Sequence, residues 1–280
     1  MKQQIKIFLA LSAVILIVDL VFVWINYKSS YNALLNTLVR DAESTERAFT
    51  QALDIHVGEL LQMAAFLAER EDFQALFLKG KVAVEEEGGG PGAEKAASVR
   101  KALYDAIKET WGVMEITYSL KELNFILAPD LIFFLRAQSP ENFGDPAPQM
   151  RYTINHANNK LKPTKGFETG KTYSGIFGVA PVIVHDSDSG KKIHVGSVET
   201  GASLSIILPV LDAQLNAGVA ILLSRSHLKA KMSPELFDRR FSSPPLAGNL
   251  FVESSSRPEI DSLLDSEAVP SLLFSNGTRL

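Results

Sequence analysis

The chain contains no cysteine. This absence excludes disulfide bonds, catalysis by a thiolate and zinc held by cysteine sulfur. Histidine is scarce as well: the 280 residues include five, and none of them lies in a His-Glu-x-x-His or similar metal-ligand spacing. The net charge of -4 leaves no basic field for a nucleic-acid partner. The sequence therefore predicts no metal site, no cofactor and no binding of nucleic acid.

One segment is apolar enough to cross a membrane. Residues 7–25 read IFLALSAVILIVDLVFVWI and follow Lys2 and Lys6. Such a helix would rise about 28 Å, close to a hydrocarbon core of roughly 30 Å. A cleaved signal peptide is disfavoured because the stretch is too long and lacks a small-x-small cleavage site. A buried soluble helix is disfavoured because every face is apolar. We predict a membrane anchor over residues 7–27, with residues 1–6 on the cytoplasmic side because both lysines precede it.

A long helical pattern follows the anchor. From residue 30 to residue 78 apolar side chains recur at steps of three and four, and Gly58 is the only glycine. A helix that leaves a membrane cannot bury its first turns against its own domain. The pattern therefore predicts a parallel homodimer through this helix, with a monomeric stalk as the alternative.

The middle of the chain changes to the period of a sheet. Residues 79–93, KGKVAVEEEGGGPGA, are expected to form a solvated loop before a helix over residues 94–110 that extends towards Lys121. Runs rich in β-branched and aromatic residues then predict strands. They lie at 123–127, 131–136, 173–184, 193–199 and 217–223. A hairpin turn is expected at 186–190, and a helix at 203–216. These elements predict an α+β fold with a mostly antiparallel sheet.

The last part of the chain gives weaker signals. Residues 225–280 are rich in serine and proline, with short helices expected near Pro234 and Pro258. We expect a poorly defined tail there that begins a second, membrane-proximal lobe and is cut short. No second membrane span is predicted in it.

Three patches carry the most specific pattern. Residues 133–145 read FFLRAQSPENFGD, residues 166–170 read GFETG, and residues 196–201 read GSVETG. Asp145 and Pro146 fit the N-cap and the first position of a helix, which predicts a helix start there. Arg136 ends a very apolar strand, so its guanidinium needs either a partner in the fold or a ligand.

The order of these patches resembles a known family. A strand that ends in Leu-Arg precedes Pro-Glu-x-aromatic-Gly-Asp, and Arg151 follows. Then come Gly-x-Glu-x-Gly, a strand with Pro-Val, and His-x-Gly-Ser-apolar-Glu-x-Gly. This pattern resembles the Cache-type extracytoplasmic sensor domains, single or double, of bacterial chemoreceptors, sensor histidine kinases and cyclic-dinucleotide enzymes. The resemblance covers about residues 30–223 and implies a long N-terminal helix followed by a PAS-like antiparallel sheet with flanking helices.

What the resemblance implies is the sensing of a small molecule, with an organic acid or an amino acid favoured. The pocket candidates carried over from it are Phe134, Arg136, Arg151, Tyr152, Glu168, Tyr173 and Glu199. Two of them, Arg136 and Arg151, would suit a carboxylate because a guanidinium offers paired donors. The glutamates would suit an amine. The alternative without a ligand is a structural pair between Arg136 and Glu168.

The resemblance also implies a location and an organisation. The chain is expected in the bacterial inner membrane, crossing it once, with residues 28–224 as the extracytoplasmic sensor and the helix at 30–78 as its stalk. Two rival functions stay open. A membrane-tethered enzyme is disfavoured because no nucleophile elbow, phosphate loop or metal-ligand spacing is present. A ligand-free dimerisation module would have both arginines fully paired inside the fold, and the sequence does not decide this.

Overall fold

The computed structural model describes residues 2–149, 151–170, 173–185, 190–242 and 249–264. It divides into two compact units, Met1–Gln51 and Ala52–Leu280. Helix α1, Lys2–Ala68, begins in the first unit and ends in the second.

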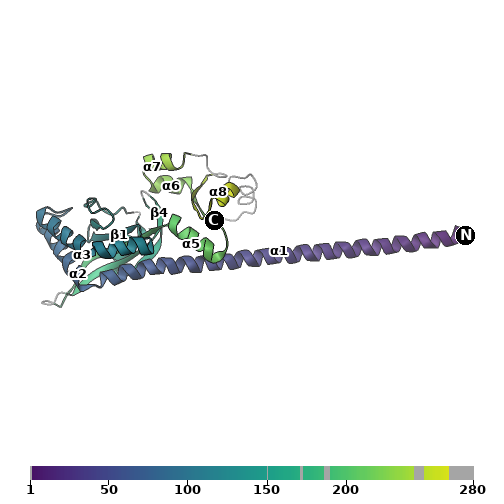
Figure 1. The fold of residues 1–280 in the computed structure, drawn as a ribbon, viewed down its shortest axis with the longest axis horizontal. Helices are drawn as coiled ribbons and strands as arrows, with labels where there is room; N and C mark the ends of the chain where they lie inside the picture. The colour runs from purple at the N-terminus through teal and green to yellow at the C-terminus, as the bar shows by residue number, and fades with distance from the viewer. Residues whose placement is uncertain (1, 150, 171–172, 186–189, 243–248, 265–280) are drawn as a thin grey trace. The chain divides into compact units, whose positions relative to one another are not determined.

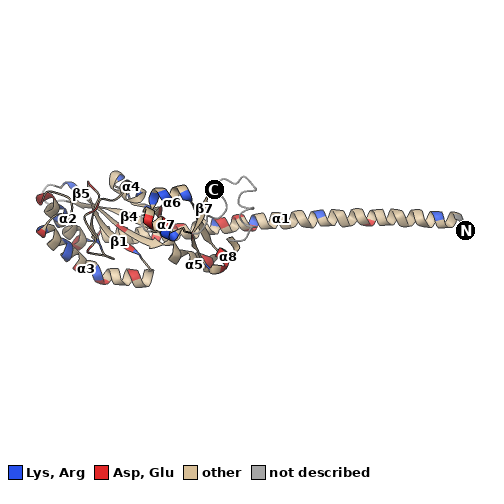
Figure 2. Cartoon of the chain, turned by 90° about the horizontal axis from the view of Figure 1, so that it is seen from above, with Lys and Arg blue, Asp and Glu red and all other residues tan. Residues whose placement is uncertain are grey.

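The first unit is a single bare helix. All described side chains from residue 3 to residue 48 are exposed. An 18-residue window in this helix has a mean hydropathy of 2.8 and is 0% buried, so the helix is long and apolar enough to span a membrane. Its first half is almost free of charge (Figure 2). Beyond the apolar window the side chains of Leu34, Leu38 and Val39 remain 54–57% exposed.

The second unit is built on a five-stranded antiparallel sheet in the order β2-β1-β5-β4-β3. Its strands are β1 (Glu122–Leu127), β2 (Ile132–Arg136), β3 (Thr164–Thr169), β4 (Ser174–His185) and β5 (Lys192–Ser203). The α+β class is confirmed. The sequence analysis missed β3, because its residues TKGFET are largely polar and partly exposed. The predicted turn at 186–190 lies mostly outside the described residues, but its flanking strands pair up to His185 and Lys192.

Helices cover one face of this sheet. The end of α1 runs beneath β4, and α2 (Glu71–Glu86) and α3 (Glu94–Tyr118) lie beside it (Figure 1). The hydroxyl of Thr200 on β5 donates to the carbonyl of Leu60 over 2.7 Å. Aromatic rings of α2 contact the strands, with Phe77 at 5.6 Å from Phe125 between ring centroids. This face holds fully buried aromatic side chains, among them Phe73, Phe77 and Phe125, and forms the main core.

The long helix is interrupted, in contrast to the continuous 30–78 helix expected from sequence. Helix α1 ends at Ala68, and α2 begins after Arg70, whose ψ of 121° is extended. The Arg70 guanidinium binds the Asp72 carboxylate through two hydrogen bonds of 3.0 and 2.6 Å. Two acids in the first turn of α2 favour a helix start there. The apolar period continues across the break, which is why periodicity alone did not reveal it.

Helix α2 also runs further than predicted, to Glu86, into the segment expected to be a loop. Glu87 follows it, and its carboxylate accepts the backbone N–H groups of Ala93, Lys95 and Ala96. These groups belong to the open first turn of α3. The acidic run is therefore partly a cap for the next helix.

Beyond the main sheet the chain forms a second, smaller sheet. Helix α5 (Leu204–Leu215) leads to β6 (Ala220–Ser224), which pairs antiparallel with β7 (Leu250–Ser255). The short helices are α6 (Arg225–Lys231), α7 (Pro234–Arg240) and α8 (Pro258–Leu264). The helices expected near Pro234 and Pro258 are confirmed. The small core of this part is Leu228, Met232, Phe237, Phe241 and Phe251.

Candidate functional site

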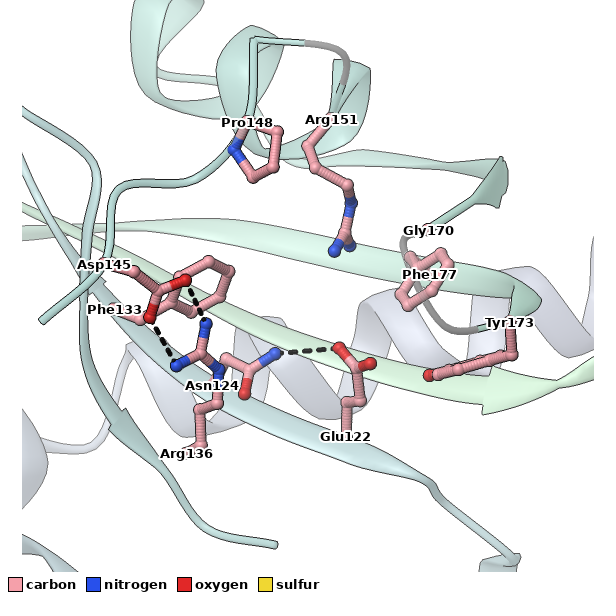
Figure 3. A pocket seen from close by; sticks show the side chains of 10 residues that line it. All are labelled: Glu122, Asn124, Phe133, Arg136, Asp145, Pro148, Arg151, Gly170, Tyr173 and Phe177. Carbon is pink, nitrogen blue, oxygen red and sulfur yellow. Dashed lines mark hydrogen bonds and ion pairs between the residues drawn. The ribbon is translucent and has the colours of Figure 1, made fainter. Parts of the chain in front are cut away.

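The second face of the main sheet carries polar residues and holds a cavity of about 210 Å³ (Figure 3). Helix α4 (Tyr152–Lys160) and the segment before it cover this face. The cavity is lined by Glu122, Asn124, Phe133, Arg136, Asp145, Pro148, Arg151, Gly170, Tyr173 and Phe177. Its volume is below the roughly 300–1,000 Å³ usual for drug-sized ligands. It therefore suits a small metabolite.

Arg151, directly before α4, is the buried cation of this site. Its Nε donates to Glu168 on β3 over 2.6 Å, and one of its terminal nitrogens donates to Glu199 on β5. Glu168 also accepts the backbone N–H of Thr153, in the first turn of α4, over 2.6 Å. The guanidinium lies over the ring of Phe177, 4.5 Å from its centroid. Two strands and one helix are thus joined through a single arginine.

The charged groups of this cluster shift one another's pKa values. Burial opposes the charged form of Arg151, but the carboxylates of Glu199, Glu122 and Glu168 outweigh it and raise the pKa of the guanidinium. Burial raises the pKa of Glu199 to about 7; Arg151 opposes this shift, and Glu122 adds to it. Glu199 therefore titrates near neutral pH.

Arg136 occupies the end of β2, but with a different partner from the one considered from sequence. Its two terminal nitrogens bind Asp145 at 2.7 and 2.9 Å, and one also donates to the carbonyl of Asn142. It does not bind Glu168, which is held by Arg151. The helix start predicted at Asp145 and Pro146 is wrong. The carbonyl of Asp145 accepts the N–H of Phe133 and Pro146 bridges to Ile132, so this stretch runs extended along β2.

A carboxylate and a hydroxyl meet at the other end of the cavity. Glu122 accepts the side-chain amide of Asn124 over 2.9 Å, and the same amide donates to Glu199 over 2.8 Å. The hydroxyl of Tyr173 is buried, and no hydrogen bond of good geometry joins it to another described residue, although the carboxylate of Glu122 lies near it. It points towards Glu122 (Figure 3). Burial, with the charge of Glu122 added, raises the pKa of Tyr173, so the hydroxyl stays protonated.

The sequence-predicted candidates divide into three groups. Arg136, Arg151 and Tyr173 line the cavity, and Glu168 and Glu199 lie behind it as the partners of Arg151. Tyr152 is 61% exposed and stacks on His156 of its own helix.

Phe134 lies in the core on the helical face, with its ring near Phe77. The cause is a bulge: Phe125 pairs with Leu135 and Ile126 with Phe133, which leaves Phe134 without a partner.

Sequence analysis did not single out Glu122 and Asn124. Both face the cavity from alternate positions of β1. Ile126, the next position on that face, packs against Ile154 and Ala157 of α4. A signal was present, because Asn124 is a polar residue at the centre of an otherwise apolar strand. Among the described residues, no group of three or more histidine or acidic side chains could hold a metal ion.

The fold and the cavity define a sensor-type α+β domain: an antiparallel sheet with a long N-terminal helix on one face and a charged ligand-sized cavity on the other. The chain belongs to the dCache_3 family, described as the double sensory domain of two-component sensor kinases, which matches residues 36–250. The expected Cache-type resemblance is thereby confirmed.

Two solved structures are similar in part. The sensor domain of the V. cholerae histidine kinase DctB is 10% identical, with a TM-score of 0.49 over 82% of this chain and 69% of that one. The periplasmic domain of RsbU from Chlamydia trachomatis is 15% identical, with a TM-score of 0.32 over 66% of this chain. This chain spans 61% of the length of the RsbU domain. Among the curated proteins none matches.

Proposed function

We propose that this chain is the extracytoplasmic sensing module of a bacterial transmembrane receptor, and that the cavity between the sheet and α4 binds its ligand. The observation that carries the proposal is the buried hydroxyl of Tyr173, which makes no hydrogen bond of good geometry within the described residues and points into a cavity lined by charged groups. A buried polar atom without a partner is costly in a finished fold. A ligand would satisfy it.

The proposal includes the organisation expected from sequence. The anchor over 7–27 would place residues 28–224 outside the inner membrane. The second sheet would begin the membrane-proximal lobe. A physical link supports signalling between the lobes: Tyr173 in the cavity wall precedes Ser174, whose N–H donates to Glu253 of β7 over 3.3 Å. His227 of α6 likewise bonds the hydroxyl of Thr169 at 2.9 Å.

Tyr173→Phe tests the pocket without changing its charge. The full chain, in detergent micelles, would be screened by thermal shift against organic acids, amino acids and amines. A ligand at 100 times its Kd should stabilise the wild type by about 2.7 kcal/mol. Loss of the hydroxyl should weaken a hit roughly 5- to 10-fold, since a neutral hydrogen bond is worth about 1 kcal/mol. The unliganded variant should be at least as stable as the wild type, because an unsatisfied group is removed.

The matched control is Tyr152→Phe, which removes an equivalent hydroxyl from an exposed ring outside the cavity. It should leave both the hit and the stability unchanged. A hit that is insensitive to Tyr173→Phe would place the ligand elsewhere, and a complete absence of hits would favour a ligand-free module.

We further propose that the chain forms a parallel homodimer through α1. Leu38 and Thr45, seven residues apart on one exposed face of the helix, would lie at the seam. The double change Leu38→Asp and Thr45→Asp should convert the dimer to monomer in sedimentation equilibrium of the micellar protein, because it sets like charges against each other. Asn36→Asp, on the opposite side of the helix, should keep the dimer. An unchanged mass for the double variant would contradict a seam at these positions.

A further inference from the structure

We infer that the ligand of the cavity carries an ammonium group, and that the cavity selects against dicarboxylates. The inference rests on the proposed sensing function and narrows its ligand class, since the resemblance favoured an organic acid or an amino acid alike. Its basis is that both arginines of the cavity are already neutralised by carboxylates of the chain.

Each arginine of the cavity already binds at least one carboxylate of the chain. Arg136 gives both terminal nitrogens to Asp145 and shares one with the carbonyl of Asn142. Arg151 gives Nε to Glu168 and one terminal nitrogen to Glu199. A carboxylate ligand would compete with these carboxylates for the guanidinium groups, and two of them, Glu168 and Glu199, are at most 7% exposed. Separating a buried ion pair leaves a charge without compensation and is strongly unfavourable.

The balance of charge around the cavity is negative. Two cations, Arg136 and Arg151, face four acids, which are Glu122, Asp145, Glu168 and Glu199. Even with Glu199 protonated, three acids remain against two arginines. A dicarboxylate would add two negative charges to this set, whereas an ammonium group would lower the imbalance.

The structure also offers a place for the ammonium group. Glu122 is the acid of the set that forms no ion pair with an arginine within the described residues, although its charge acts on Arg151, and it accepts the side-chain amide of Asn124. The hydroxyl oxygen of Tyr173 faces the same space (Figure 3). A carboxylate offers about four acceptor positions, and an ammonium group carries three donors. The ring of Tyr173 lines the same cavity and adds an aromatic face that attracts a cation.

Three probes with the same four-carbon skeleton test the charge alone: succinate, 4-aminobutanoate and 1,4-diaminobutane. Binding to the full chain in detergent micelles would be measured by titration calorimetry at 150 mM salt. We expect 1,4-diaminobutane to bind at least tenfold more tightly than succinate. Tight binding of succinate together with absent binding of both amines would overturn the inference. The sensing function would then still stand if Tyr173→Phe weakened succinate.

Glu122→Gln keeps the shape of the side chain and removes its charge. It should weaken 1,4-diaminobutane at least tenfold, since a charge-assisted hydrogen bond is worth more than a neutral one. It should not weaken the binding of succinate. Glu109→Gln is the control, because it removes the same charge from an exposed position on α3, where salt screens it. Equal weakening by both variants, or none by Glu122→Gln, would overturn the inference.

Discussion

Gly178→Ala is expected to destabilise the sensor unit by at least about 3 kcal/mol, although it adds only one methyl group. A Cβ at this position on β4 would lie 2.3 Å from the backbone nitrogen of Leu61 and 2.5 Å from its Cα. Real Cβ atoms do not approach backbone this closely, and a helix backbone cannot rotate aside as a side chain can. The helix would have to lift away from the sheet.

The neighbouring contacts make that movement costly. Thr200 pairs with Gly178 across the sheet, and its hydroxyl binds the carbonyl of Leu60. Lifting α1 would break this buried hydrogen bond and open the core around Leu60 and Ala64, which are at most 4% exposed. This contact between β4 and α1 joins the sheet to the helix that continues towards the membrane segment.

Urea unfolding of the micellar protein, followed by near-UV circular dichroism, measures the effect. The matched control is Gly112→Ala on α3, where a Cβ meets nothing within 4 Å. Alanine should stabilise that helix by roughly 0.5–1 kcal/mol relative to glycine. Similar stabilities for the two variants would show that α1 is not seated on β4 as the structure has it.

The sequence predicted the elements whose signal is local. Apolar and β-branched runs predicted four strands of the main sheet. The helix predicted at 203–216 is α5, and Ser203 caps its start by accepting the N–H of Ser205. The strand β3 has no such run and was missed. The break after Ala68 was missed because the apolar period continues through it and only the backbone of Arg70 changes.

The site was predictable in its residue types but not in its pairing. Arginines and glutamates in the three patches indicated a charged site, and three of the seven candidates line the cavity. Which acid binds which arginine depends on strand order and on a bulge at Phe134, and neither has a signature in this sequence. Asp145 precedes a proline, which is typical of a helix N-cap. Its pairing with Arg136 in the structure is equally compatible with that local pattern, so the sequence did not distinguish the two roles.

Arg151→Met is expected to be the most destabilising change within the cavity, by about 3–5 kcal/mol at pH 8. Methionine fills much of the same volume but leaves Glu168 and Glu199 without their cation. Both carboxylates belong to side chains that are at most 7% exposed, so water cannot replace the guanidinium. The link between β3, β5 and α4 would be lost with it.

The dependence of the free energy of unfolding on pH identifies the cause of this destabilisation. In the wild type the pKa of Glu199 is raised to about 7, above its ordinary value of 4.5. The folded state therefore holds a proton that the unfolded state has released, and stability falls as pH rises from about 4.5 to about 7. Without Arg151 the attraction that opposed this shift is gone, so the pKa of Glu199 should rise further. The variant should lose stability more steeply with pH and recover part of it at pH 5.

Urea unfolding at pH 5 and pH 8 measures both effects, with Arg136→Met as the matched control. The Asp145 partner of Arg136 is 51% exposed, and an ion pair open to water contributes at most about 1 kcal/mol. The control should therefore cost little at either pH. If Arg151→Met cost equally little, or cost the same at both pH values, the buried carboxylates would not depend on Arg151 for their charge. The cluster would then be free to exchange that arginine for a ligand, and the selection against dicarboxylates would lose its main support.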